Sequence, residues 1–151
     1  MLGIGVDKLR QILNHGRRGA PREVCGLLSG RDGWVTRVYP LRNLEKDPNR
    51  FFASPTGQYR AFQDIEQRGE TLVGIYHSHP GGEAVPSPRD VEMAYYPDIA
   101  YLILALGREP TVRAFRIREG KVWPGRLVVA MPGGEVRECM EFVFGPEGGP
   151  R

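Results

Sequence analysis

Apolar residues recur along this chain at two spacings, and each spacing predicts a different kind of element. Intervals of three and four residues, which place apolar side chains on one face of a helix, predict helices over residues 7–16, 54–69 and 87–96. Short apolar runs bounded by glycine, proline or polar residues are typical of strands. Such runs cover residues 24–28, 34–41, 51–53, 70–79, 100–106, 112–117, 121–123, 126–131 and 136–144, after a short apolar start at 2–6. Because hairpins and helical crossovers alternate, the pattern predicts one α/β domain with a mixed sheet.

Cap and turn residues refine these boundaries. Asp7 is expected to cap the first helix, and a serine followed by proline begins each of the others, at residues 54–55 and 87–88. Residues 30–33 and 119–120 carry glycine and predict tight hairpin turns. The unbroken apolar run at 100–106 predicts a central strand covered on both faces.

The spacing of residues also predicts the environment of several side chains. His15 falls on the polar side of the first helix and is expected in solvent. The pair Tyr95 and Tyr96 is expected to place one ring in the core and one at its rim. Apolar residues of the other helices are expected to share one face each: Tyr59, Phe62 and Ile65, and then Val91, Ala94 and Tyr95.

Composition narrows the class of protein. The chain has 151 residues, 40% hydrophobic and 26% charged, which is typical of one globular domain. The net charge of +3 is spread along the chain, so nucleic-acid binding is not predicted, and no run approaches the roughly 20 apolar residues of a membrane span. Two distant cysteines, Cys25 and Cys139, predict buried reduced thiols and a cytoplasmic protein. We expect a domain over residues 1–144 and a flexible tail over 145–151.

Candidate chemistry gathers after the buried strand that ends at residues 77–79. His77 and His79 are two residues apart, so a strand presents both to the same side, as a metal site requires. Asp90 is the nearest downstream aspartate and a candidate third ligand. Spacing makes Glu83 a candidate base or ligand, with further candidates elsewhere in the chain: Glu23, Glu70 and Glu92. A structural alternative stays open, because Ser87 and Asp90 also form a good helix start.

The pattern His77-x-His79-Pro80, followed after six residues by Ser87-x-x-Asp90, resembles the JAMM (MPN+) metalloprotease motif. The resemblance implies that two histidines and Asp90 hold one Zn²⁺ per chain, with water as the fourth ligand. It implies that Ser87 donates a hydrogen bond to the oxyanion of the tetrahedral intermediate.

A second family signature is a glutamate ahead of a glycine-containing apolar strand, and residues 21–30 resemble it. The resemblance implies that Glu23, rather than Glu83, is the general base. Glu83 and Gly82 are left as candidates for lining the substrate channel. The similarity extends loosely over residues 2–129.

The family resemblance also carries an expectation of fold and function. It implies an MPN domain, a mixed sheet flanked by helices and similar to cytidine deaminases. It implies a zinc-dependent peptidase or isopeptidase that hydrolyses the bond after the C-terminal glycine of a ubiquitin-like or sulfur-carrier protein. The compact chain resembles the small, stand-alone prokaryotic members, and a Gly-Gly tail suits a narrow cleft because it has no Cβ atoms. Removing a C-terminal extension, releasing an amino acid and detaching the carrier from lysines all stay open, as does the oligomeric state.

Two other classes of function are compatible with parts of the motif. A non-catalytic MPN scaffold that binds partner proteins is the main alternative, although every expected motif position is filled here. A zinc deaminase is not favoured, because that chemistry expects H-x-E and P-C-x-x-C and the sequence has neither.

Overall fold

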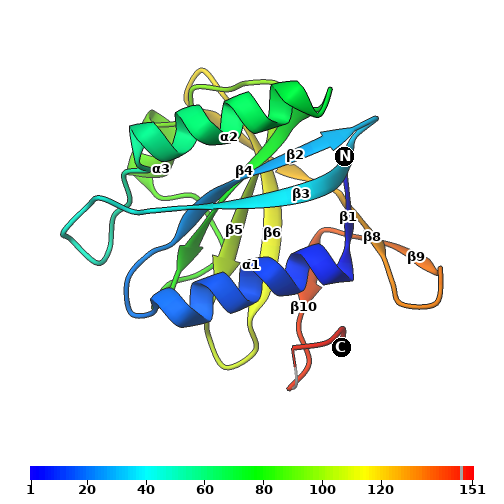
Figure 1. The fold of residues 1–151 in the computed structure, drawn as a ribbon. Helices are drawn as coiled ribbons and strands as arrows, with labels where there is room; N and C mark the ends of the chain where they lie inside the picture. Colours follow the sequence, from blue (N-terminus) through cyan, green and yellow to red (C-terminus); the bar gives the residue numbers. More distant parts are fainter. Residues whose placement is uncertain (147) are drawn as a thin grey trace.

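The computed structural model describes residues 1–146 and 148–151, which form a mixed sheet with helices on both faces (Figure 1). The elements follow in the order β1 (Leu2–Gly5), α1 (Val6–Gly19), β2 (Cys25–Arg31), β3 (Trp34–Leu41), α2 (Pro55–Gln67), β4 (Thr71–His79), α3 (Pro88–Glu92), β5 (Ala100–Ala105), β6 (Thr111–Arg118), β7 (Lys121–Gly125), β8 (Leu127–Ala130), β9 (Val136–Cys139) and β10 (Glu141–Val143). The predicted α/β fold class is confirmed.

The sheet places β4 near its middle. Its order is β10-β6-β5-β4-β2-β3-β1-β8-β9, with β7 also paired to β6. Strand β4 runs antiparallel to β2 and parallel to β5, and β1 is parallel to both β3 and β8. The parallel step from β4 to β5 is the crossover that contains α3. Because β4 is hydrogen-bonded to a strand on each side, the sheet holds the residues at its end in place.

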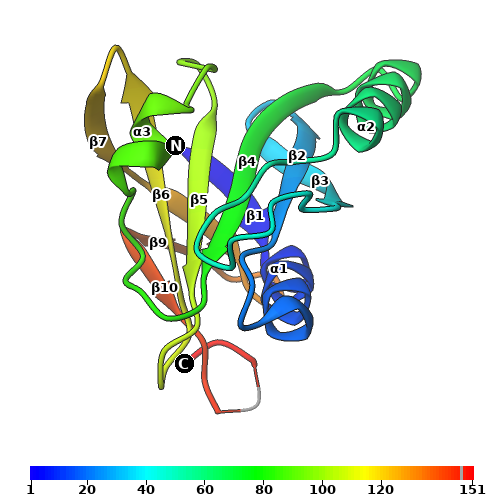
Figure 2. The same cartoon turned by 90° about the vertical axis from the view of Figure 1, so that its left-hand side faces the viewer.

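Alternation along the strands separates two apolar layers. Leu28, Tyr76 and Leu102 point to the face covered by α1 and join the larger core. Their neighbours point to the opposite face: Leu27 packs with Ala61 of α2, while Ile103 packs under the segment that follows α3. In Figure 1 the strands pass between α1 and α2, and in Figure 2 the strands β4 and β5 are seen between α3 and α2. The histidines of β4 occupy strand positions whose side chains point to this second face.

The two predicted hairpin turns are present where glycine allows them. Asp32 and Gly33 have φ of 51° and 79°, and Glu119 and Gly120 have φ of 51° and 75°. Two successive left-handed residues are what a two-residue turn with the correct strand twist requires. Ser54 also caps α2 as predicted, its hydroxyl accepting the N–H of Gly57 at 3.1 Å.

Other expectations were wrong at the level of single residues. The first helix starts at Val6 with Gly5 as its N-cap, so Asp7 lies within the first turn. His15 is not free in solvent, because its Nδ1 lies 2.7 Å from the hydroxyl of the buried Tyr76. Such a partner from another element cannot be read from helical spacing.

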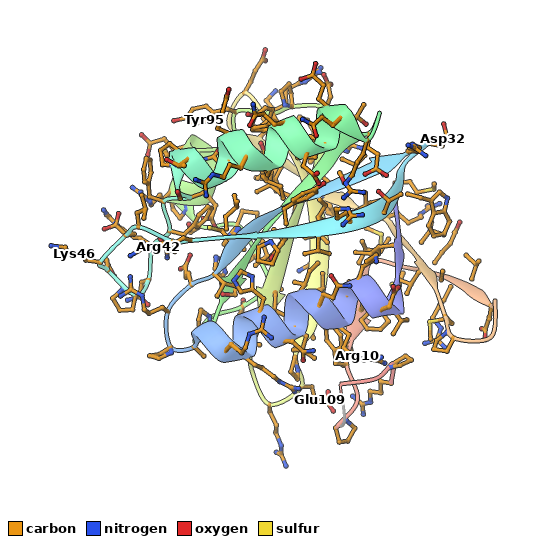
Figure 3. All side chains as sticks on the ribbon, viewed as in Figure 1. Arg10, Asp32, Arg42, Lys46, Tyr95 and Glu109 are labelled. Atoms are coloured by element: carbon orange, nitrogen blue, oxygen red, sulfur yellow. The ribbon has the colours of Figure 1, made fainter. Side chains whose placement is uncertain are left out.

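Exposed aromatic rings and broken strands are further corrections. Tyr95 and Tyr96 are both exposed, at 70% and 40%, so neither is a core residue, and Tyr59 is exposed as well. Figure 3 labels Tyr95 at the surface of the molecule. The run 136–144 is two strands, β9 and β10, and residues 51–53 contribute only an isolated bridge from Ala53 to Asn43.

The described residues of the C-terminal segment fold back onto the rest of the domain. Gly145 donates its N–H to the carbonyl of Gly149, and Arg151 donates to the carbonyl of Val143 and to Glu109. Glu147 lies outside the described residues. The division into a domain and a flexible tail stays a prediction. Among the described residues no helix is both long and apolar enough to cross a membrane.

Candidate metal centre

The end of β4 brings the two motif histidines together. Their Nε2 atoms are 3.0 Å apart, and the two rings meet edge to face. His77 is buried and His79 is half-buried. Because residues i and i+2 of a strand share one side, this approach follows directly from the sequence spacing.

The short helix α3 supplies a carboxylate to both rings. Asp90 Oδ2 lies 3.0 Å from Nε2 of His77 and 3.1 Å from Nε2 of His79. The same oxygen accepts the N–H of Ser87 at 2.8 Å, while Ser87 Oγ accepts the N–H of Asp90 at 3.1 Å. This reciprocal pair is a capping box, so the structural reading of residues 87–90 holds together with the metal-site reading.

The distances among these three residues fit a small divalent cation with nitrogen and oxygen ligands. In a tetrahedral zinc site with ligands at about 2.0–2.1 Å, neighbouring ligand atoms lie roughly 3.3 Å apart. The three separations of 3.0, 3.0 and 3.1 Å are close to that value. Among the described residues, ligand atoms of Glu23, His77 and His79 also lie within 4.8 Å of one another. The shorter distances favour Asp90 over Glu23 as the third ligand candidate.

Glu23 reaches the histidines through the pairing of β2 with β4. Cys25 at the start of β2 is opposite His77, so the segment just before β2 lies beside the end of β4. The Glu23 side chain is only 7% exposed. Burial raises its pKa to about 7, with His79 opposing the rise and Asp90 adding to it. A carboxyl group with a pKa near neutrality can both accept and release a proton.

Burial and hydrogen bonds shift the pKa values of the three ligand candidates in different directions. Burial lowers the pKa of His77, against the opposing hydrogen bond with Asp90, so this ring is neutral near pH 7. Burial lowers the pKa of His79 too, but hydrogen bonds with Asp90 and with the Glu83 carbonyl outweigh it, and the pKa rises. Burial favours a higher pKa for Asp90, yet hydrogen bonds from both histidines hold it well below its usual range, so the carboxylate stays ionised.

Glu83 takes a different place from the one that spacing suggested. Its backbone carbonyl lies 2.8 Å from Nδ1 of His79, which fixes the proton on that nitrogen and turns Nε2 toward the centre. Its side chain is exposed, and Gly82 is exposed beside it. Glu70 lies at the other end of β4, bonded to Ser29 and Thr36, and Glu92 is exposed on α3.

A cavity of about 380 Å³ opens beside these residues on the second face of the sheet. It runs from Glu23, His77 and Ser87 over an apolar floor that includes Leu27 and Ile103. Its walls include four aromatic side chains and one methionine: Phe51, Phe52, Tyr95, Tyr96 and Met93. The sequence predicted a helix over residues 87–96, with the two tyrosines in the core and at its rim. Helix α3 ends at Glu92, so both tyrosines lie beyond the helix, in the segment that ends at Pro97.

Phe51 is a site residue that sequence reasoning missed. Its ring stacks on His77, with centroids 4.7 Å apart and planes inclined by 27°. Cys25, in contrast, is the inert buried thiol that was predicted: it is 1% exposed, and burial raises its pKa to about 12. Cys139 is free but only half-buried.

Comparison with known protein families decides the assignment. The family of prokaryotic homologs of the JAB domain matches residues 6–118 of the chain. The chain belongs to this family. The resemblance to JAMM (MPN+) proteins noted from the two motifs is therefore confirmed, with the matched residues including the histidines, Ser87 and Asp90.

Three curated relatives that the chain resembles over most of its length bear the names of enzymes. The chain is 35% identical to the CysO-cysteine peptidase of Mycobacterium tuberculosis over 127 residues, which is 81% of this chain and 86% of the relative. It is 40% identical to a probable TtuB-protein conjugate cleaving protease of Thermus thermophilus over 114 residues, covering 75% and 74% of the two chains. A desampylase of Haloferax volcanii is 38% identical over 109 residues, covering 68% and 78%. The predicted class of enzyme, a hydrolase of peptide-like bonds, is that of these relatives.

Solved structures agree with the fold. A protein from Desulfitobacterium hafniense, determined in solution, has a TM-score of 0.78 and 36% identity, covering 85% of this chain and 92% of its own. A JAB1/MPN domain protein from Archaeoglobus fulgidus has a TM-score of 0.56 at 19% identity, covering 85% of this chain and 98% of its own. The second likeness supports the JAB/MPN fold alone.

Proposed function

We propose that this JAB-family protein is a zinc-dependent peptidase or isopeptidase that cleaves after the C-terminal glycine of a ubiquitin-like or sulfur-carrier protein. One observation carries the proposal: Nε2 of His77, Nε2 of His79 and Oδ2 of Asp90 lie within 3.0–3.1 Å of one another, beside an apolar cavity. Two imidazoles and one carboxylate are the donor set of many zinc hydrolases, which keep one position open. When bound, zinc would supply Lewis acidity, polarising the scissile carbonyl and making water acidic near neutral pH.

Glu23 takes the role of general base in this proposal. Its carboxylate is buried at the edge of the ligand cluster, close to both histidines but outside the set of shortest distances. With a pKa of about 7, it can accept a proton from water and pass it to the leaving amine. Glu83 offers only its carbonyl to the site, so its side chain is not a competing base.

Ser87 takes the role of oxyanion donor. Its Oγ accepts the N–H of Asp90, which leaves the hydroxyl proton free to donate toward the cavity that the residue lines. A donor held by a helix cap needs no rearrangement when negative charge develops on the substrate oxygen. The Ser87 hydroxyl can therefore cap the helix through a lone pair of its oxygen and donate its proton to the substrate oxygen.

The substrate class follows from the relatives and from the shape of the site. Their names describe cleavage of a CysO-cysteine adduct, of TtuB-protein conjugates and of sampylated proteins. We infer that this chain acts on a carrier of the same kind with a C-terminal Gly-Gly, since a tail without Cβ atoms can pass close to the ligand cluster. A scaffold function is disfavoured because the ligand, base and donor positions are all filled.

The test is hydrolysis of defined carrier substrates. Each ubiquitin-like carrier of the host is prepared with a C-terminal extension, with a single added amino acid, and joined to a lysine side chain. We expect the mass of at least one substrate to fall to that of the free carrier, only without chelator, and activity to return with Zn²⁺. Absence of cleavage in all three forms by zinc-loaded protein would exclude the proposed activity, and zinc binding without cleavage would favour the scaffold.

A further inference from the structure

The segment that carries Glu23 is held on one side by β4, through Val24 and Ser78, and on the other by a loop. Glu23 lies between α1 and β2, outside any helix or strand. Its N–H donates to the carbonyl of Pro48 at 3.1 Å, and its carbonyl accepts a hydrogen bond from the Asn43 side chain at 2.9 Å. Both partners belong to the connection between β3 and α2, residues 43–53. The position of Glu23 therefore depends on how firmly this connection is folded.

The Asn43 side chain is the centre of that connection. Its Nδ2 donates to the carbonyls of Glu23 and Arg50 at 2.9 and 3.0 Å. Its Oδ1 accepts the N–H groups of Glu45 and Phe52, each at 2.9 Å. A primary amide offers two donors and two lone pairs, so Asn43 uses its whole hydrogen-bonding capacity on backbone groups. Aspartate keeps the acceptors but loses both donors, and alanine loses all four bonds.

The same connection also touches the ligand half of the site. Phe51, one residue after the Arg50 carbonyl, stacks its ring on His77. At the other end, the guanidinium of Arg22 donates to the carbonyls of Glu45 and Lys46. Figure 3 labels Lys46 at the outer end of this connection, away from the sheet. Residues 43–53 thus join the segment before β2 to the ring of a candidate metal ligand.

We propose that Asn43 is a positioning residue for the reaction, which holds the Glu23 carboxylate at its working distance from the ligand cluster. The role in turnover rests on the proposed function, because it takes Glu23 as the base, whereas the hydrogen-bonded link to Glu23 does not. A displacement of about 1 Å in a reacting group is enough to lower a rate by roughly 10²-fold. Loss of the Asn43 donors should therefore reduce kcat while the substrate still binds.

The test compares Asn43→Ala and Asn43→Asp with a matched control, Ser54→Ala. Ser54 directly follows this connection, and its Oγ accepts the N–H of Gly57 as the cap of α2. We expect both Asn43 variants to lower kcat by roughly 10- to 100-fold, with KM and zinc content as in the wild type. Ser54→Ala should change kcat by less than about twofold, although it also loses a side-chain hydrogen bond to the backbone.

Hydrogen exchange in metal-free protein gives a readout that does not depend on activity. The Glu23 amide should exchange faster in both Asn43 variants, and at the wild-type rate in Ser54→Ala. The amide of Val24 should be unaffected in every variant, because the hydroxyl of Ser78 accepts it at 2.8 Å. Asn43→Asp should also keep the protection of the Glu45 and Phe52 amides, which Asn43→Ala loses.

Each outcome decides the proposal. Faster exchange at Glu23 together with a lower kcat and an unchanged KM supports it. Wild-type exchange at Glu23 in Asn43→Ala would overturn the link, and faster exchange with full turnover would reduce Asn43 to a structural residue. If the wild-type protein cleaves no carrier, the proposed function fails by itself, and the exchange rates still decide whether Asn43 holds Glu23.

Discussion

The two halves of the candidate site are built in different ways. The ligand half, His77, His79, Ser87 and Asp90, lies within fourteen residues at the end of β4 and the start of α3. The base half is Glu23, more than fifty residues upstream, in a segment outside helix and strand that the 43–53 connection holds in place. Strand periodicity and helix capping fix the first half locally, whereas long-range contacts place the second. The halves should therefore fail separately, and the following variants test that separation.

The largest effect is expected from the ligand half. His77→Ala removes one nitrogen from a cluster in which all ligand atoms lie within about 3 Å of each other. We expect zinc content to fall from about one ion per chain to near zero, with turnover lost, since three protein ligands are the usual minimum. Metal analysis after gel filtration measures this. His15→Ala, a histidine on α1 bonded to Tyr76, is the control that keeps its zinc.

The base half should fail without loss of metal. Glu23→Gln keeps the shape of the side chain but cannot accept a proton, so kcat should fall by roughly 10²–10⁴-fold while zinc content is unchanged. Steady-state cleavage of a carrier substrate and metal analysis on the same sample give both values. Glu83→Gln should remain active, because only the backbone of that residue reaches the site. An inactive Glu83→Gln beside an active Glu23→Gln would reverse the assignment of the base.

Ser87 tests whether one residue can belong to a helix cap and to the reaction. Ser87→Ala should lower kcat by roughly 10²–10³-fold, as for one oxyanion donor. It should also lose about 1 kcal/mol of stability, because its Oγ caps α3. Ser54→Ala is the control for the cap alone, since it caps α2 and should leave kcat unchanged. Full turnover in Ser87→Ala would leave this serine with a structural role only.

The smallest effect is a gain in stability on removing the buried base. Folding raises the Glu23 pKa from 4.5 to about 7, so the folded protein holds a proton there that the unfolded chain releases. Wild-type stability should fall as pH rises through this window, and Glu23→Gln should escape that loss. In metal-free protein the variant should match the wild type below pH 4.5 and exceed it by about 1–3 kcal/mol above pH 7. Urea unfolding at pH 4 and pH 8 measures the difference, and equal stabilities at pH 8 would contradict it.

Features that depend on neighbouring residues could be predicted from the sequence, whereas features that depend on distant segments could not. The helix start at Ser87, the hairpin turns and the central run of β5 were predictable because each depends on a few neighbouring residues. The environments of His15 and Tyr95 were not, since each depends on which element packs nearby. The division of 136–144 into β9 and β10, which pair with different strands, was hidden for the same reason.

By itself the sequence determined the local geometry of two residue pairs in the candidate ligand half. The two-residue spacing of the histidines in a strand, and the three-residue spacing of Ser87 and Asp90 in a capping box, leave each pair one local geometry. Tertiary structure alone decided how close Glu23 comes, through the pairing of Cys25 with His77 and through the four hydrogen bonds of Asn43. The physical reason is range: backbone periodicity acts over a few residues, whereas burial and register depend on segments that meet only after the chain has folded.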